Sequence, residues 1–247
     1  MVKNPYESSQ LLGEYLLFHY GSKEDLMPWI SGPSNGIDFP LRTVSELIDP
    51  TTLGMGTHAL DLGCAVGRST FELASHCSKV KGIDYSASFI DAANALAEKG
   101  ELPYQFREEG DLFKEAVAVV PSNQRRKVEF EVGDACSLNP ALGYFDVVHA
   151  ANLLCRLPDP NLLFKRLPEL VKPGGQLLLT TPFTWLEEFT PRKNWLGSGD
   201  SEEELGRILS PDFELEEKRE MPFVIREHRR KFQYSVSLGT RWRRLQS

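Results

Sequence analysis

The stretch HALDLGCAVGRST, residues 58–70, constrains the fold of this chain more than any other. It joins a short apolar run that carries Asp61 to a glycine-rich turn, and the turn leads into a segment able to start a helix. In an open α/β sheet, such a junction places backbone N–H groups and a helix N-terminus at the carboxyl end of a strand, where small ligands bind. The sequence therefore predicts a ligand site beside Gly63 and Gly67.

The segments around this stretch predict a doubly wound α/β fold. Residues 68–76 are expected to form a helix and residues 79–83 the next strand, after which Ser86 caps a second helix that Gly100 ends. This strand–turn–helix–strand–helix unit is the mononucleotide-binding half of such a fold. The first strand is expected at residues 57–62. Further strands are expected at residues 128–132, 145–150 and 176–181, with helices at residues 161–170 and 203–209.

The remaining segments extend this sheet or cover its edge. Strands at about 213–226 and 230–238 form a terminal hairpin that adds an antiparallel strand to an otherwise parallel sheet. Residues 101–127 do not continue the alternation of strands and helices. They are expected to be an insertion with one helix that either gates the binding edge or lies on the surface without a role. We predict one structural unit, with residues 1–56 as an N-terminal helical arm and residues 57–247 as the main domain.

The arm is expected to carry a helix that Ser8 or Ser9 caps and Gly21 ends. Such arms close over small-molecule sites as lids, although their aromatic residues serve equally well as packed core. A second helix at residues 39–48 carries Arg42, which either meets a ligand carboxylate or faces solvent. The polar and aromatic residues that flank the first helix are Asn4, Pro5, Tyr6, His19 and Tyr20.

Charge and cysteine usage exclude several classes of protein. A net charge of −7 argues against a protein that follows nucleic-acid phosphates, and the alternating arginines and aromatics after residue 226 fit a hairpin with one polar face. The four cysteines form no CxxC pair, so we expect no metal site. No signal peptide or membrane span is expected, and a cytoplasmic location follows. The oligomeric state stays open.

Three acidic residues, Asp61, Asp84 and Asp134, fall at the ends of consecutive strands and could all contact one ligand. Asp84 follows the glycines by about twenty residues and is placed to accept two ribose hydroxyls. Asp134 can accept from the exocyclic amine of adenine, with Ala135 donating a backbone N–H to a ring nitrogen. Asp61, in front of the turn, disfavours the pyrophosphate of an NAD-dependent enzyme and suits a cationic ligand with an α-amino group. These features point to S-adenosylmethionine.

With these motifs in order, the chain resembles the class I S-adenosylmethionine-dependent methyltransferases over about residues 57–240. The resemblance rests on DLGCAVG, GIDYS, GDA, FDVVHAANLL and KPGGQLLLTTP. It implies a seven-stranded Rossmann-like sheet and S-adenosylmethionine as cofactor. The residues that it assigns to the cofactor are Arg42, Asp61, Gly63, Cys64, Ala65, Gly67, Asp84, Tyr85, Ser86, Asp134, Ala135 and Ala150.

The flanking segments resemble a narrower group, the methyltransferases of ovothiol biosynthesis. NPYESSQLLGEYLLFHYG and TTPFTWLEEFTPRKNWLG carry this second resemblance. Members of that group are 4-mercaptohistidine N1-methyltransferases, either as the C-terminal domain of ovothiol synthase or as a free-standing protein. The resemblance implies transfer of a methyl group to an imidazole nitrogen of 5-thiohistidine, the last step of ovothiol biosynthesis.

That zwitterionic acceptor requires a cation, an acid or carbonyl, and aromatic walls. Arg156 or Arg192 can meet its carboxylate, and Glu187 or Glu188 its amine. Asn152 stands where this fold meets the methyl acceptor, and His19, Tyr20 or Asn152 can orient the ring. His19 could also take the released proton or simply pack at a helix end. The expected aromatic walls are Tyr6, Tyr20, Phe183 and Trp185.

Other acceptors remain compatible with the general motifs. The same chemistry could act on another small molecule, or on RNA or protein, and RNA binding would be sensitive to salt. A non-catalytic S-adenosylmethionine-binding partner protein is a third class. The sequence leaves open which ring nitrogen is methylated.

Overall fold

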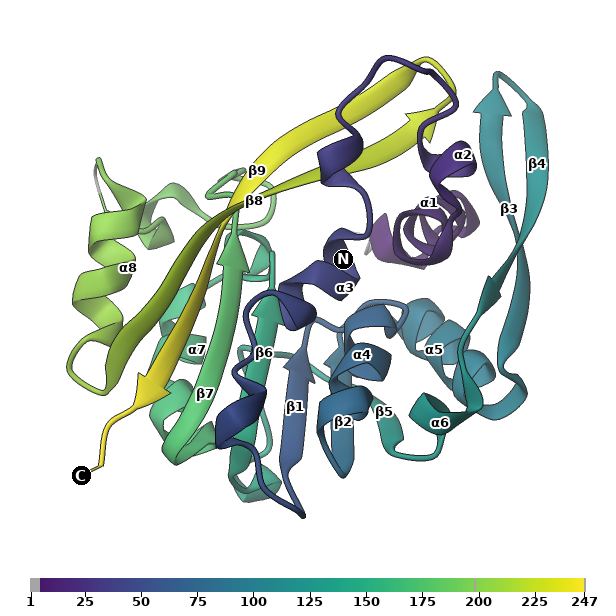
Figure 1. Ribbon diagram of the computed structural model, residues 1–247. Coiled ribbons are helices and arrows are strands. Elements are labelled where there is room, and N and C mark those ends of the chain that lie inside the picture. The colour runs from purple at the N-terminus through teal and green to yellow at the C-terminus, as the bar shows by residue number, and fades with distance from the viewer. Residues whose placement is uncertain (1–4, 198, 247) are drawn as a thin grey trace.

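A seven-stranded sheet forms the centre of the molecule (Figure 1). The structure is a computed structural model that describes residues 5–197 and 199–246, so Asn4 of the arm lies outside the described residues. The strand order is β5-β2-β1-β6-β7-β9-β8. Neighbouring strands are parallel except where β9 pairs with β7 and β8. This order confirms the predicted doubly wound sheet with one antiparallel strand from the C-terminal hairpin.

Most predicted elements have close counterparts, although β7 begins earlier and β9 ends later than expected. The strands are β1 (His58–Leu62), β2 (Lys79–Asp84), β3 (Glu101–Glu109), β4 (Leu112–Val119), β5 (Val128–Val132), β6 (Phe145–Ala151), β7 (Val171–Thr181), β8 (Phe213–His228) and β9 (Lys231–Arg244). The α-helices are α1 (Ser9–Tyr20), α2 (Lys23–Leu26), α3 (Phe39–Ser45), α4 (Arg68–His76), α5 (Ala87–Lys99), α6 (Ser122–Arg125), α7 (Pro160–Leu170) and α8 (Ser201–Leu209).

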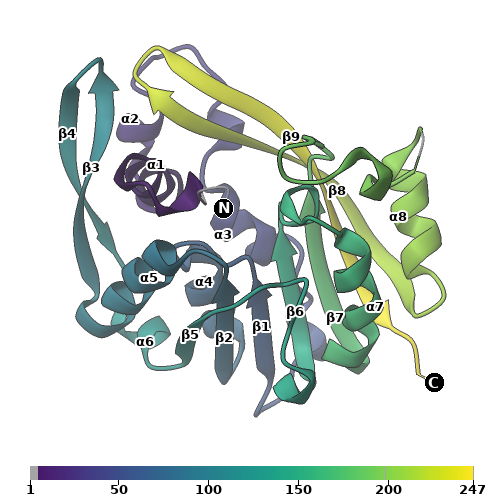
Figure 2. The same cartoon turned by 180° about the vertical axis from the view of Figure 1, so that it is seen from behind.

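Alternation along the central strands gives the sheet two apolar faces. Val148 of β6 lies in the core cluster that includes residues of α7 and α8, whereas the preceding Val147 lies in the cluster that includes residues of α3 and α4. Leu177 and Leu178 of β7 divide in the same way. Successive side chains of a strand point to opposite faces, so helices must cover both. Figure 2 shows α7 in front of the sheet, on the face opposite α3 and α4.

The predicted helix of the N-terminal arm is present as α1. The Ser8 hydroxyl caps it by accepting from the N–H of Leu11 at 3.2 Å, and Gly21 follows its last residue. Gly13 lies against β3, where an added Cβ would come within 2.2 Å of the Gln105 carbonyl oxygen. The missing side chain therefore permits the close packing of α1 on β3.

The insertion expected at residues 101–127, with one helix, is mostly β-structure instead. Strands β3 and β4 form a separate antiparallel hairpin, and only α6, a single turn, is helical. Tyr104, Phe106 and Ala118 are buried in the cluster that also contains residues of α1 and α5. Tyr104 and Phe106 alternate with exposed Gln105, and Ala118 lies between exposed valines, which is a strand pattern that the apolar run at residues 116–120 obscured.

Together, α1, α2 and two hairpins form a cap over the carboxyl edge of the sheet. In both views α1 and α2 lie between the β3–β4 hairpin and the far end of the β8–β9 hairpin. Arg226 of β8 pairs with Glu108 of β3 and also donates to the carbonyl oxygen of Asp25 in α2. Lys114 of β4 pairs with Asp25. Charged contacts thus join all three parts of the cap.

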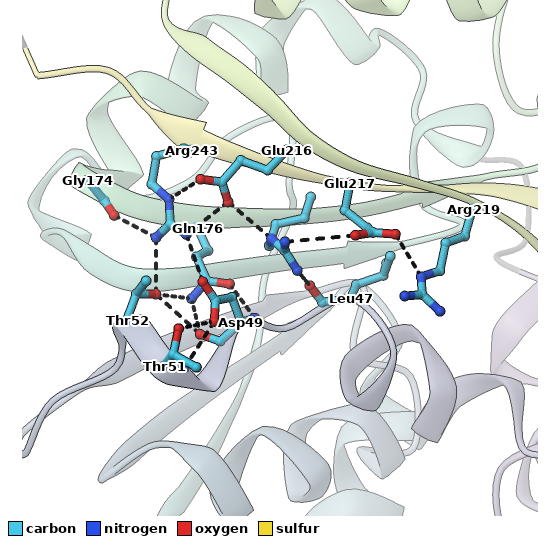
Figure 3. A network of polar contacts seen from close by, with 11 residues as sticks. Leu47, Asp49, Thr51, Thr52, Gly174, Gln176, Glu216, Glu217, Arg219 and Arg243 are labelled. Atoms are coloured by element: carbon cyan, nitrogen blue, oxygen red, sulfur yellow. Dashed lines mark hydrogen bonds and ion pairs between the residues drawn. The ribbon is translucent and has the colours of Figure 1, made fainter.

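Below the cap, the C-terminal hairpin binds the linker that precedes β1 (Figure 3). Gln176 of β7 is fully buried: its Oε1 accepts from Asp49 N–H, and its Nε2 donates to the Asp49 carbonyl and the Thr52 hydroxyl, each at 2.9 Å. Arg243 of β9 contacts Asp49, Thr52 and Glu216. Both contacts fix the start of the strand that carries the glycine-rich turn.

Gln176→Ala is expected to lower the free energy of unfolding by about 1–3 kcal/mol, because the Asp49 N–H and C=O lose their partners. Gln233→Ala is the matched control, since Gln233 is exposed and bonds only Glu227 among the described residues. Its effect should stay within about 0.5 kcal/mol. Urea denaturation measures both, and equal effects would contradict this role of Gln176.

Candidate functional site

The turn between β1 and α4 is held against the end of β2. The N–H groups of Gly63 and Cys64 donate to the Ile83 carbonyl at 2.8 and 3.2 Å. Gly67 has φ of 86° at the start of α4, and no side chain caps this helix end. Backbone donors at an uncapped helix N-terminus are available to a ligand. Ala65 also has a positive φ, 47°, a strained conformation that is concentrated at functional sites.

Asp61 lies beneath this turn and is almost completely enclosed, with 1% of its surface exposed. Oδ2 accepts from the hydroxyls of Ser69 and Thr70 at 2.8 and 2.6 Å, and Oδ1 lies 2.7 Å from Nδ1 of His149. These contacts fix the turn on the sheet. Direct binding of a ligand amine by Asp61 stays a prediction, because the enclosed carboxylate is already bonded to three side chains.

Asp84 joins the glycine-rich turn to the acidic turn after β2. Its two oxygens accept from the N–H groups of Ala65 and Ser86 at 2.8 and 2.9 Å. Burial raises the pKa of this carboxyl, and the N–H groups of Ser86 and Ala65 oppose that rise. Each oxygen keeps acceptor capacity for a further donor, as the predicted contact with two ribose hydroxyls requires.

The third predicted acid lies beside the second. Gly133 N–H, at the end of β5, donates to the Asp84 carbonyl at 2.9 Å. The Asp134 carboxylate accepts from the N–H of Cys136 at 2.8 Å and shapes the turn that contains buried Ala135. The structure therefore brings the ends of β1, β2 and β5 together, as the three acids predicted. Tyr85 projects outward and is 65% exposed, whereas Ala150 of β6 is buried.

The arm closes directly over these turns. The Tyr20 hydroxyl donates to the Val66 carbonyl at 2.8 Å. The Tyr6 carbonyl accepts from the hydroxyls of Ser86 and Ser88, and the Glu7 carboxylate accepts from the N–H groups at the start of α5. Glu7 was not predicted because its partners follow it by about eighty positions and no local sequence pattern marks it.

His19 presents an enclosed polar atom on the inner side of α1. Its Nδ1 is buried and has no hydrogen-bond partner among the described residues. Burial lowers the pKa of His19 from its ordinary value of 6.5 to about 3, so the imidazole is neutral at pH 7. An unpartnered buried nitrogen is costly without a ligand. A ring with this pKa is a poor base, which favours hydrogen bonding over proton removal.

Arg156 and Tyr6 meet at the end of the sheet beyond β6. The guanidinium carbon lies 5.0 Å from the ring centre of Phe189, and the ring of Tyr6 lies 6.3 Å from that of Phe189. Burial raises the pKa of Tyr6, and the charge of Arg156 opposes this. One guanidinium nitrogen donates to the carbonyls of Cys155 and Thr184. Phe189 was not predicted, although the aromatic spacing of its segment was a signal.

Other predicted site residues are engaged elsewhere. Arg42 pairs with Glu46 and donates to two backbone carbonyls, one of them in β8. Trp185 stacks on Trp195, with ring centres 6.4 Å apart, and its indole N–H donates to Ser201 at the start of α8. Glu187 is exposed. Phe183, with φ of 51°, packs against the core below α7. Ligand contacts of these four residues stay predictions, because the contacts that the structure describes are all with other parts of the protein.

Comparisons with known proteins agree with this arrangement. A family model described as a methyltransferase domain matches residues 60–179. The ubiquinone biosynthesis O-methyltransferase of Coxiella burnetii is 32% identical over 126 residues, which cover 51% of this chain and 44% of that protein. Phosphoethanolamine N-methyltransferase 3 of Arabidopsis thaliana is 29% identical over 57% of this chain and 24% of its own length. The chain thus spans less than half of these relatives.

Residues 60–179 thus match a methyltransferase domain, and the fold around them is that of S-adenosylmethionine-dependent methyltransferases of known structure. A solved S-adenosylmethionine-dependent methyltransferase of Methanosarcina mazei superposes with a TM-score of 0.55 at 22% identity, over 81% of this chain and all of that chain. The N-methyltransferase NodS of Bradyrhizobium japonicum, solved with S-adenosylhomocysteine, gives 0.52 at 18% identity over 84% of each chain. Both confirm the methyltransferase fold. Among the described residues, no helix has the length and hydropathy needed to cross a membrane.

The residues of this edge fit the cofactor. The uncapped start of α4 and the acceptor oxygens of Asp84 offer donors and acceptors at one edge of the sheet, where Tyr20 of α1 contacts the glycine-rich turn. When bound, S-adenosylmethionine supplies an electrophilic methyl group on a sulfonium. The neighbouring carboxylates favour that positive charge.

Asp84→Asn is expected to weaken S-adenosylhomocysteine binding by about 10- to 100-fold, because the ribose hydroxyls lose a charged acceptor. Asp91→Asn is the control, since Asp91 is an exposed aspartate on α5. Isothermal titration calorimetry measures both dissociation constants. Unchanged affinity in the Asp84 variant would contradict the assignment.

Acidification is expected to destabilise the protein partly through His19. Because folding lowers its pKa from 6.5 to about 3, the unfolded chain takes up the proton first. The stability present above pH 6.5 is therefore lost as the pH falls toward 3. His19→Phe should lose stability less steeply in denaturation experiments across this range, whereas exposed His58→Phe should follow the wild type. Parallel loss in all three proteins would refute this role.

Proposed function

We propose that this protein transfers the methyl group of S-adenosylmethionine to an imidazole ring nitrogen of 5-thiohistidine. The observation that carries the proposal is the placement of Arg156 beside Tyr6 and Phe189, in the segment that follows Asn152 after β6. The likeness of the arm and of residues 180–197 to the ovothiol methyltransferases supports the same acceptor. The similar O- and N-methyltransferases leave the acceptor open, so its identity depends on this local chemistry.

Arg156 matches the carboxylate of a free amino acid. One of its nitrogens is anchored to two backbone carbonyls, which holds the guanidinium before a substrate arrives. Arg156 also contacts the hydroxyls of Thr184 and Tyr6. A substrate carboxylate would compete with these neutral partners for the guanidinium N–H groups, and charged pairs are the stronger hydrogen bonds. The rings of Tyr6 and Phe189 provide apolar walls for a flat heterocycle.

Methyl transfer to such a ring requires alignment more than a strong base. A lone pair of the ring nitrogen forms the new N–C bond while the C–S bond breaks, and the methylated ring then releases a proton. With a pKa of about 3, His19 is suited to hold the ring by a hydrogen bond and not to accept that proton. The cap formed by α1 and the two hairpins excludes water from the reacting atoms.

The wild-type protein is expected to add one trideuteromethyl group to 5-thiohistidine when supplied with S-(trideuteromethyl)-labelled cofactor. Mass spectrometry measures the product, and fragmentation locates the label on the ring. Arg156→Gln should raise KM for 5-thiohistidine by about 10- to 100-fold without changing S-adenosylhomocysteine affinity. Arg166→Gln is the matched control, because Arg166 lies on α7 and pairs with Glu169.

The outcomes test the identity of the acceptor separately from the identity of the cofactor. If the wild type binds S-adenosylhomocysteine but does not label 5-thiohistidine, the proposed acceptor is wrong and the methyltransferase assignment stands. Label on the sulfur in place of a ring nitrogen would also overturn the proposal.

A further inference from the structure

The side chain of Asn152 is held by two buried hydroxyl groups from different strands. Its Oδ1 accepts from Thr180 Oγ1 of β7 at 3.0 Å and from Ser237 Oγ of β9 at 2.7 Å. Thr180 and Ser237 are both fully buried. Asn152 itself follows β6 with φ of 52°, and its N–H donates to the Thr180 carbonyl at 2.9 Å. Its backbone and side chain are therefore both fixed.

These two hydroxyls determine which way the amide faces. Among the described residues, both hydroxyl groups donate to the same acceptor, Asn152 Oδ1. If the amide were reversed, its nitrogen would donate to both hydroxyl oxygens, and two buried O–H groups would lose their acceptors. Native proteins avoid unpaired buried donors, so the observed orientation is strongly favoured.

The orientation leaves Nδ2 of Asn152 as the free end of the side chain. This nitrogen makes no hydrogen bond among the described residues, and Asn152 is partly exposed at the carboxyl end of β6. The adjacent residue, Leu153, lies against Gly63, where an added Cβ would come within 2.9 Å of its side chain. The turn that carries Asn152 therefore borders the glycine-rich turn at the carboxyl edge of the sheet.

We infer that Thr180 and Ser237 are positioning residues that make Asn152 a hydrogen-bond donor toward the methyl acceptor. An amide nitrogen donates and does not accept. The substrate group that it meets therefore carries an unshared electron pair, as in a thiolate, a carboxylate, a hydroxyl or an unprotonated ring nitrogen, and is not a group that can only donate, such as an ammonium. This inference rests on the proposed function for the place of the acceptor, but the orientation of the amide does not.

The orientation is tested without substrate by neutron diffraction from crystals of the wild-type protein exchanged into D₂O. The expected result is that the deuterons of Thr180 and Ser237 point to Asn152 Oδ1, with both Nδ2 deuterons directed away from them. Nδ2 deuterons directed at the two hydroxyl oxygens would overturn the inference. The neutron experiment decides the orientation of the amide even if 5-thiohistidine is not the substrate.

The role in substrate binding is tested with matched variants. Thr180→Val removes a hydroxyl that holds Asn152, whereas Thr240→Val removes a buried hydroxyl of β9 that donates to Leu179. Thr180→Val and Ser237→Ala should each raise KM for 5-thiohistidine by about tenfold with S-adenosylhomocysteine affinity unchanged. Thr240→Val should leave KM unchanged. Equal KM values in all variants would overturn the positioning role.

Asn152→Asp provides the sharpest contrast between donor and acceptor. The carboxylate still accepts from both hydroxyls, so the fold is retained, but its second oxygen replaces the donating nitrogen. We expect kcat/KM for 5-thiohistidine to fall by more than about tenfold with S-adenosylhomocysteine affinity maintained. Full activity of this variant would contradict the inference. If the wild type itself does not methylate 5-thiohistidine, the proposed function fails and the neutron result alone decides the orientation.

Discussion

The enclosed carboxylate of Asp61 is the interaction on which the rest of the site depends. A buried charge is tolerated only when it is hydrogen-bonded, and Asp61 meets this condition through Ser69, Thr70 and His149. His149 in turn contacts the Thr43 hydroxyl of α3 at 3.0 Å. One carboxylate therefore joins β1, α4 and β6, and through His149 also α3. The glycine-rich turn rests on this network, which fixes the start of α4 at the cofactor edge.

The proposed acceptor side of the site draws on segments that are far apart in the chain. Tyr6 comes from the arm, Asn152 and Arg156 follow β6, and Ser237 belongs to β9. The contacts of Glu7 with the start of α5 fasten the arm to the turn after β2. Closure of the cap and shaping of the cofactor edge are consequently coupled. A ligand bound at this edge would stabilise both.

The local parts of the fold were predictable from sequence because their signals are local. The helix at residues 68–76 and the strand at residues 128–132 have the expected bounds, since caps, glycines and apolar periodicity mark them. The β3–β4 hairpin was missed because pairing between strands depends on a partner that the apolar run alone does not reveal. The same limit applies to the site: the strand ends could be predicted, but the contact of His149 with Asp61 joins residues 88 positions apart. Arg42 and Trp185 were predicted to bind a ligand because of their residue type, whereas their partners in the structure are other residues of the protein.

The central claim is that one cofactor lies across the ends of β1, β2 and β5, beneath α1. A crystal structure of the complex with S-adenosylhomocysteine tests it most directly. We expect the ribose hydroxyls on Asp84 and the adenine beside Asp134. A ligand bound away from this edge, or Asp84 without contact to the ribose, would contradict it.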